Sequence, residues 1–162
     1  MTHQAPLITS FSLADEGATT RFGQRLAGLV GAGDAILLEG PIGAGKSHIA
    51  RALIQTKLAA EGLYEDVPSP TYTLVQTYMA GELEIWHTDL YRLSDTSEVQ
   101  ELGLEDVFDT ALCLIEWPDR LGAAAPPDPL KISIEVTDPG RRLSLEAAGS
   151  AWADRLARLS EG

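Results

Sequence analysis

Hydrophobic and polar positions alternate along this chain at two different spacings, which indicates a mixture of helices and strands. Apolar residues first recur at helical spacing, and this pattern predicts a helix that begins near Asp15 and ends at Gly31 or Gly33. Two short apolar runs, residues 35–39 and 111–116, predict strands. The second run is almost wholly apolar, as is typical of a central strand covered on both faces.

The other segments also divide between the two patterns. Residues 71–79 and 82–88 are rich in β-forming side chains and flank Ala80-Gly81, which predicts a hairpin or a tight reversal. A short run lies at residues 7–11. Further strands are predicted at residues 132–136 and 143–145, and further helices at 48–60, 97–102 and 152–159. This mixture predicts a single domain over residues 1–162, an α/β fold of three α/β/α layers whose mixed sheet has parallel and antiparallel strands.

Residues 40–47 carry the clearest chemical signal. They read Gly-Pro-Ile-Gly-Ala-Gly-Lys-Ser, a full match to the phosphate-binding pattern G-x-x-x-x-G-K-[S/T], and they lie between a predicted strand and a predicted helix. Glycines let the backbone curl around a phosphate with its N–H groups pointing inward, and the helix N-terminus adds a positive dipole end. Lys46 is placed to reach the β- and γ-phosphates, and the Ser47 hydroxyl to bind Mg²⁺. The chain is therefore predicted to bind a nucleoside triphosphate.

Composition restricts the partners of such a site. The 162 residues carry a formal net charge of −12, which disfavours unaided binding to nucleic acid or anionic lipid. No apolar run approaches the roughly 18 residues of a membrane span, and residues 1–12 lack the layout of a signal peptide. The single cysteine, Cys113, lies in an apolar run and is expected to be a buried, unreactive thiol. Together these features predict a cytoplasmic protein with no membrane partner.

The identity of the nucleotide and its metal can be narrowed further. GTPases read guanine through an Asn-Lys-x-Asp motif, and none of the lysines Lys46, Lys57 and Lys131 has those neighbours, so ATP is expected. An acid at the end of an apolar strand is well placed to hold Mg²⁺ or its water shell, and Glu116 fits that description. A strand-end acid can equally be a solvated boundary residue.

Two more polar segments are candidates for a hydrolytic site. Ser69-Pro70-Thr71 lies between a predicted helix and strand, where a segment that senses the γ-phosphate could lie, although by itself it is only a proline turn. Asp89 could orient an attacking water or help to hold Mg²⁺, and Arg92 could neutralise developing charge. The alternative is a surface pair between Asp89 and Arg92, with His87 and Tyr91 packed in the wall.

Taken together, these motifs resemble the TsaE (YjeE) family. The matching segments are residues 40–47, 67–75, 87–93, 101–103 and 114–118, with further matches near Asp15 and Arg141. The resemblance implies a small bacterial ATPase that is needed to make N6-threonylcarbamoyladenosine at position 37 of tRNAs reading codons that start with A. It also implies two partner proteins, TsaB and TsaD. TsaD transfers the threonylcarbamoyl group, while weak ATP hydrolysis by the TsaE protein resets the complex, so that tRNA is contacted only indirectly.

The resemblance also assigns roles to single residues. Those implied to bind ATP or ADP are Asp15, Glu16, Gly43, Ala44, Gly45, Lys46, Ser47, His48 and Arg141. Those implied to act in hydrolysis are Asp89, Lys46 and Thr71, and those implied to bind Mg²⁺ are Ser47 and Glu116. Trp117 is expected either to line the nucleotide site or to pack in the core.

The chain departs from the family pattern in a few places. Pro41 replaces a common acidic residue and has no N–H to donate, which puts one backbone contact in doubt. Ser47 replaces the usual Thr but keeps the hydroxyl, and His48 follows it. Two other functions remain open from the sequence: a small-molecule kinase, which would also need an acceptor pocket and usually an Arg-rich lid, and a nucleotide sensor that does not hydrolyse ATP.

Overall fold

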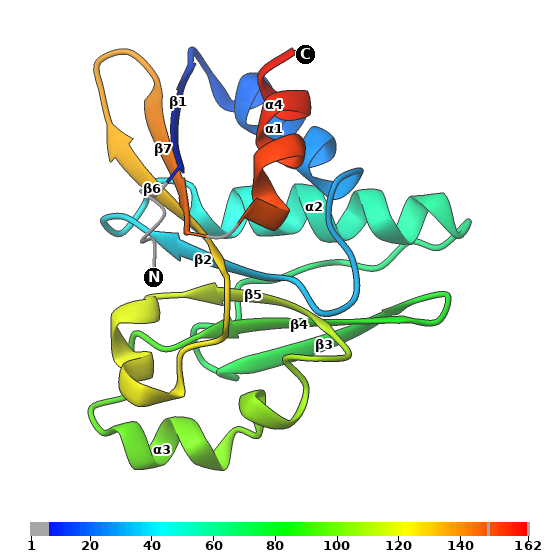
Figure 1. The fold of residues 1–162 in the computed structure, drawn as a ribbon, viewed down its shortest axis with the longest axis vertical. Helices are drawn as coiled ribbons and strands as arrows, with labels where there is room; N and C mark the ends of the chain where they lie inside the picture. The colour runs from blue at the N-terminus through cyan, green and yellow to red at the C-terminus, as the bar shows by residue number, and fades with distance from the viewer. Residues whose placement is uncertain (1–6, 149, 162) are drawn as a thin grey trace.

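A seven-stranded mixed sheet forms the centre of the computed structural model, which describes residues 7–148 and 150–161 (Figure 1). Its strands are β1 (Leu7–Leu13), β2 (Ala35–Glu39), β3 (Val75–Ala80), β4 (Leu83–Asp89), β5 (Leu112–Glu116), β6 (Leu130–Val136) and β7 (Arg141–Ala147). They lie in the order β1-β7-β6-β2-β5-β4-β3. Strands β6, β2, β5 and β4 pair in parallel, whereas β3, β7 and β1 are joined by antiparallel pairing, so the predicted mixed sheet is confirmed.

Helices cover both faces of this sheet. The α-helices are α1 (Glu16–Ala27), α2 (Lys46–Ala60), α3 (Thr96–Glu101) and α4 (Ala153–Glu161), and the 3₁₀ helices are η1 (Leu104–Asp106), η2 (Pro118–Ala124) and η3 (Ser150–Trp152). Figure 1 shows α1, α2 and α4 on one side of the sheet and α3 on the other. None of the helices in the described part of the chain has the length and apolar character that a membrane crossing requires. The predicted α/β/α layering is therefore confirmed.

Two apolar clusters, one on each face, hold the layers together. Strand β5 contributes to both, because its side chains alternate: Leu112 and Leu114 pack with the helices α1, α2 and α4, while Cys113 and Ile115 pack on the side of α3. Every residue of β5 is buried, as predicted for a central strand covered on both faces. The sheet thus holds the ends of its central strands in fixed positions.

Some predicted element boundaries are wrong, and the differences have local causes. Helix α1 ends at Ala27 rather than at Gly31 or Gly33, because the Gly28 and Leu29 N–H groups close its last turn on the Arg25 and Leu26 carbonyls at 3.2 Å and 2.9 Å. Helix α2 begins at Lys46, two residues before the predicted start at position 48.

The strand predicted from residue 71 begins only at Val75. Residues 71–74 instead form a turn, which a 2.7 Å hydrogen bond from the Leu74 N–H to the Pro70 carbonyl closes. Thr71 therefore lies in a loop and not in the sheet.

Helices α1 and α2 approach one another closely at Gly23. A Cβ atom added there would lie 2.6 Å from the Ala52 Cβ and 3.0 Å from the Ile49 carbonyl oxygen. Only glycine allows this approach without a shift of one helix. The contact therefore fixes the distance between α1 and the helix that follows residues 40–45.

We expect Gly23→Ala to destabilise the protein by about 1–3 kcal/mol, because the added methyl group overpacks the interface between α1 and α2. Urea unfolding followed by circular dichroism measures this loss. The matched control is Gly28→Ala, whose Cβ would come no closer than 3.6 Å to another group, the Arg25 carbonyl. Equal stability of the two variants would contradict the packing argument.

The thiol of Cys113 is expected to be chemically silent in the folded protein. Burial raises the pKa of Cys113 to about 12, so the reactive thiolate is scarce near neutral pH. A thiol-specific disulfide reagent at pH 8 should therefore modify the protein only after urea is added. Rapid stoichiometric reaction of the folded protein would show that the strand β5 opens readily.

Candidate functional site

The parallel strands bring three polar segments together at one edge of the sheet. Residues 40–45 follow β2, Glu116 ends β5 and Asp89 ends β4. In the register of the sheet, Glu116 lies opposite Leu38 on one side and opposite Asp89 on the other. Ligand sites in open α/β sheets commonly lie at such carboxyl ends.

The loop after β2 presents an open concave backbone. Gly43 and Gly45 have φ values of 81° and 116°, which favour glycine, and a Cβ added at either position would meet no atom within 4 Å. Within the described residues, no side chain caps the start of α2, and its first turn has no acidic residue. The N–H groups of this turn, which have no partner inside the helix, are therefore available to an anion.

Lys46 lies buried beneath this loop, with 5 % of its surface exposed. Its Nζ donates to the carbonyls of Gly40 at 2.6 Å and Pro41 at 3.0 Å, and it lies 4.2 Å from the centre of the Trp117 ring. Burial lowers the pKa of Lys46, and the charges of Glu116 and Asp89 oppose that shift. A phosphate oxygen would be a stronger acceptor for this ammonium group than the two neutral carbonyls.

Pro41, whose missing N–H raised doubt, takes part in the loop through its carbonyl group. That oxygen accepts hydrogen bonds from Lys46 Nζ and, at 3.1 Å, from the Ala44 N–H. A proline supplies this acceptor as well as any other residue does. The departure at Pro41 therefore leaves these internal hydrogen bonds of the loop in place.

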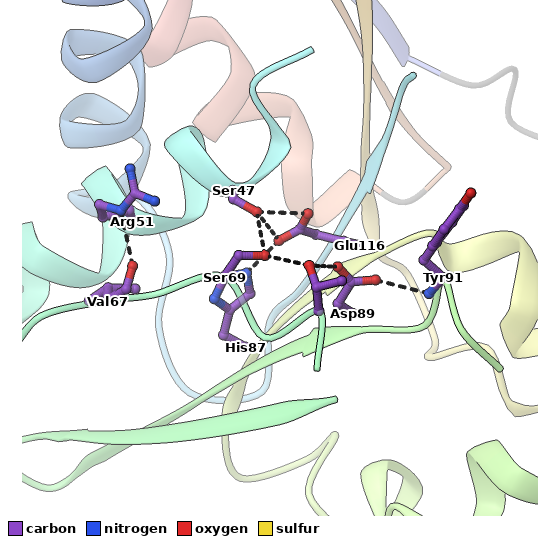
Figure 2. Close-up of polar contacts among 9 residues, drawn as sticks. Ser47, Arg51, Val67, Ser69, His87, Asp89, Tyr91 and Glu116 are labelled. Carbon is purple, nitrogen blue, oxygen red and sulfur yellow. Dashed lines mark hydrogen bonds and ion pairs between the residues drawn. The ribbon is translucent and has the colours of Figure 1, made fainter. Parts of the chain in front are cut away.

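A buried carboxylate joins α2 to the sheet (Figure 2). Ser47 Oγ lies 2.8 Å and 3.0 Å from the two carboxylate oxygens of Glu116, and His87 Nε2 lies 2.7 Å from Oε2 of the same group. Only 2 % of Glu116 is exposed. Glu116 is thus a fixed acceptor inside the site, not the solvated boundary residue that the sequence also allowed.

The hydrogen bonds continue from Ser47 to Asp89, as Figure 2 shows. The hydroxyls of Ser47 and Ser69 lie 3.2 Å apart, those of Ser69 and Thr71 lie 2.8 Å apart, and Thr71 donates to Asp89 Oδ2 at 3.1 Å. The Tyr91 N–H donates to the other oxygen, Oδ1, at 2.9 Å. Both carboxylate oxygens of Asp89 are therefore oriented, and the loop that holds Ser69 and Thr71 is connected to the strand ends.

The alternative pairing of Asp89 with Arg92 is wrong. Within residues 7–148 no ion pair joins these side chains, and Arg92 instead donates to the Tyr72 carbonyl at 3.1 Å. The expected packing of His87 is correct, because this side chain is fully buried. Tyr91 is packed less completely than expected, since 42 % of it is exposed.

The residues at this edge fit a magnesium ion that is held together with a nucleotide. Ser47, Glu116 and Asp89 supply hydroxyl and carboxylate oxygens, the donors that Mg²⁺ prefers. Among the residues that the structure describes, no group of three His, Cys, Asp or Glu side chains could hold a metal unaided. Mg²⁺ in nucleotide sites typically takes one or two carboxylates and completes its shell with phosphates and water.

Two adjoining cavities contain all of the predicted site residues. The larger, about 450 Å³, extends from the loop to the start of α1, and its lining includes Asp15, Glu16, Gly43, Ala44, Gly45, Lys46, Ser47, His48, Glu116 and Arg141. The smaller, about 190 Å³, is lined by residues that include Thr71 and Asp89. Lys46, Ser47 and Glu116 line both cavities, so the two form one continuous site.

Arg141 and Trp117 both contact the phosphate-loop region. Arg141 Nε donates to the Ala44 carbonyl at 2.9 Å, which ties the strand β7 to the loop. Trp117 lines the smaller cavity and also packs on the Tyr91 ring, with 4.8 Å between ring centres. Trp117 thus packs against the apolar cluster on the side of α3, as one expectation had it, while its role towards a nucleotide stays a prediction.

The sequence did not identify several residues of the site. Thr19 and Arg51 line the larger cavity, but each lies inside a helix, and nothing in the local sequence pattern distinguishes it from the other polar residues there. Arg51 also donates to the Val67 carbonyl at 3.0 Å, which anchors the loop that leads to Ser69 (Figure 2). The sequence predicts His87 only as a residue that packs in the wall of the site. Its contact with Glu116 depends on the pairing of β4 with β5, which spacing alone does not reveal.

The fold and residues 40–47 define an α/β protein of the phosphate-loop class. Residues 13–143 match the family described as "Threonylcarbamoyl adenosine biosynthesis protein TsaE", and the chain belongs to this TsaE family. The resemblance predicted from the motifs is thereby confirmed.

Individual relatives agree with this assignment. The chain is 35 % identical over 131 residues to the tRNA threonylcarbamoyladenosine biosynthesis protein TsaE of Rickettsia felis, which covers 81 % of this chain and 75 % of that protein. It is 34 % identical over 141 residues to the protein of the same name from Haemophilus influenzae, covering 83 % and 87 %. The crystal structure of Bacillus subtilis YdiB has the same fold, with a TM-score of 0.76, 24 % identity, and coverage of 99 % of this chain and 98 % of that one.

Proposed function

We propose that this protein binds ATP with Mg²⁺, hydrolyses it weakly alone, and acts with TsaB and TsaD in making N6-threonylcarbamoyladenosine at position 37 of tRNA. ATP hydrolysis would reset the TsaB–TsaD complex between turnovers. Membership of the TsaE family supports the pathway. The observation that carries the ATPase role is the continuous hydrogen-bond network from Glu116 through Ser47 to Asp89, next to Lys46 and an open phosphate loop.

In this proposal, backbone N–H groups of Gly43 and of residues 45–48 and the Lys46 ammonium hold the phosphates, with Arg141 at the rim of the loop. The nucleoside would occupy the larger cavity, towards Asp15, Glu16 and His48. Ser47 and Glu116 would hold Mg²⁺, which when bound neutralises charge on the β- and γ-phosphates. The acidic balance of the chain suits a protein that acts on a protein complex and contacts tRNA only indirectly.

Asp89 is proposed to orient the attacking water. Thr71 and the Tyr91 N–H fix its two oxygens, and only 4 % of the residue is exposed. The orientation of the carboxylate is therefore fixed, and so is the direction from which it can accept a hydrogen bond from a water. The water oxygen would attack the γ-phosphorus while the bond to the ADP oxygen breaks. Positioning and charge compensation supply most of the rate in such reactions.

The first test compares ATP turnover with and without the TsaB–TsaD complex. Because a missing cationic group can cost roughly 10³–10⁵ in rate, and Arg92 is bound to the Tyr72 carbonyl, we expect slow hydrolysis alone and a clear rise when the partners bind. The partners would order residues 69–71 or complete the charge environment of the γ-phosphate. Equal rates with and without partners would contradict this role.

The second test reconstitutes tRNA modification with TsaB, TsaD and a source of threonylcarbamoyl-adenylate. We expect Asp89→Asn to bind ATP but to lower its turnover by about 10²-fold or more, a typical effect of losing a positioned acid–base group. Modification should then stop after the first turnovers. Asp154→Asn, at an exposed position on α4, is the matched control and should behave as the wild type.

Other outcomes of the reconstitution identify other functions. Full multiple-turnover modification without this protein would reject the pathway role. Unchanged ATP turnover and modification by Asp89→Asn would instead favour a nucleotide sensor that does not hydrolyse ATP. Transfer of phosphate from ATP to a compound in a metabolite library would favour a small-molecule kinase.

A further inference from the structure

His87 is buried in the sheet and is not used in the mechanism proposed above. It pairs in register with Leu114, two residues before Glu116 on the neighbouring strand, so the side chains of His87 and Glu116 leave the same face of the sheet. His87 Nε2 lies 2.7 Å from Glu116 Oε2, and neither side chain is more than 3 % exposed. A carboxylate that binds a metal ion is ionised and only accepts hydrogen bonds, so in that role Glu116 is the acceptor and Nε2–H the donor.

Packing alone does not account for a histidine at this position. Within the described residues, the other ring nitrogen, Nδ1, is buried and has no hydrogen-bond partner. A buried polar atom without a partner destabilises the folded state, and an apolar side chain of similar size would avoid that cost. The contact that distinguishes His87 from an apolar residue is therefore its hydrogen bond to Glu116.

The hydrogen bond from His87 is the one side-chain contact to Glu116, among the described residues, that would not also be a metal ligand in the proposed site. Within the described part of the chain, the Glu116 carboxylate has hydrogen bonds from only two side chains, Ser47 and His87. A Ser47 hydroxyl bound to Mg²⁺ would direct a lone pair to the ion and would have only its one hydrogen atom to share between Glu116 and Ser69. His87 would remain as the fixed donor on the side of the sheet.

We propose that His87 is a positioning residue for Glu116: its Nε2–H holds the carboxylate in the orientation in which Glu116 and Ser47 can bind one divalent cation. The inference rests on the proposed function, because it assumes that these two residues form a metal site. Residues that hydrogen-bond to metal ligands orient them, and their loss typically weakens metal affinity or activity by about 10–100-fold.

The test measures binding of Mn²⁺ to the full chain in the presence of ADP, by electron paramagnetic resonance. We expect His87→Leu to weaken Mn²⁺ binding by about 10–100-fold, whereas the affinity for ADP in the presence of a chelator stays that of the wild type. His87→Gln, whose amide N–H can reach the carboxylate, should recover most of the Mn²⁺ affinity. His87→Asn, whose amide is one bond too short, should not.

Thr88→Val is the matched control for a change in the interior of β4. Thr88 is also fully buried, its hydroxyl has no partner among the described residues, and it points to the other face of the sheet. This variant should bind Mn²⁺ as the wild type does, because the contact between His87 and Glu116 is kept.

Three outcomes would overturn the inference. In the first, His87→Leu binds Mn²⁺ with unchanged affinity. In the second, His87→Gln binds Mn²⁺ no better than His87→Asn. If circular dichroism shows that the leucine variant does not fold, the comparison of the glutamine and asparagine variants is the deciding one. A wild-type protein that binds ADP but no Mn²⁺ would instead reject the proposed metal site, and the role of His87 with it. Failure of the inference and failure of the proposed function are thus distinguished.

Discussion

The parallel pairing of β2, β5 and β4 is the constraint on which the rest of the site depends. Because these strands run in the same direction, their carboxyl ends meet at one edge, and the register sets Glu116 beside both Leu38 and Asp89. The loop at residues 40–47 leaves the same edge and turns into α2. Segments that are far apart in the sequence therefore become neighbours at this edge.

Burial of three charged side chains at this edge adds a second constraint. Glu116, Asp89 and Lys46 are each nearly inaccessible, and isolated charges in such positions are costly. The two carboxylates oppose the shift that burial imposes on the pKa of Lys46, and hydrogen bonds from Ser47 and Thr71 satisfy the carboxylates. The charged groups therefore depend on one another, so changing one of them alters the environment of the others.

The sequence identified the local features of this site better than the long-range ones. Residues 40–47, the strand ending at Glu116 and the polar segment Ser69-Pro70-Thr71 follow from short patterns whose chemistry is local, although the β-forming pattern wrongly includes Thr71 in a strand. The strand order and the contact between His87 and Glu116 depend on pairing between distant segments, which apolar spacing does not encode. The late start of β3 has a similar cause, since a turn hydrogen bond overrides the β-forming character of residues 71–74.

Backbone conformation on both sides of the network supports a functional origin for this arrangement. Leu74 and Trp117 have φ values of 70° and 60°, and such conformations cost a residue other than glycine about 1–3 kcal/mol. Trp117 directly follows Glu116, and the Leu74 carbonyl accepts a 2.9 Å hydrogen bond from the Asp89 N–H. Leu74 and Trp117, two of the three described residues other than glycine with positive φ, therefore each adjoin one of the two acids. Stability alone would favour glycine at these two positions. Instead, the turn at Leu74 holds the loop of Thr71, and the turn at Trp117 holds its indole ring, against the proposed phosphate site.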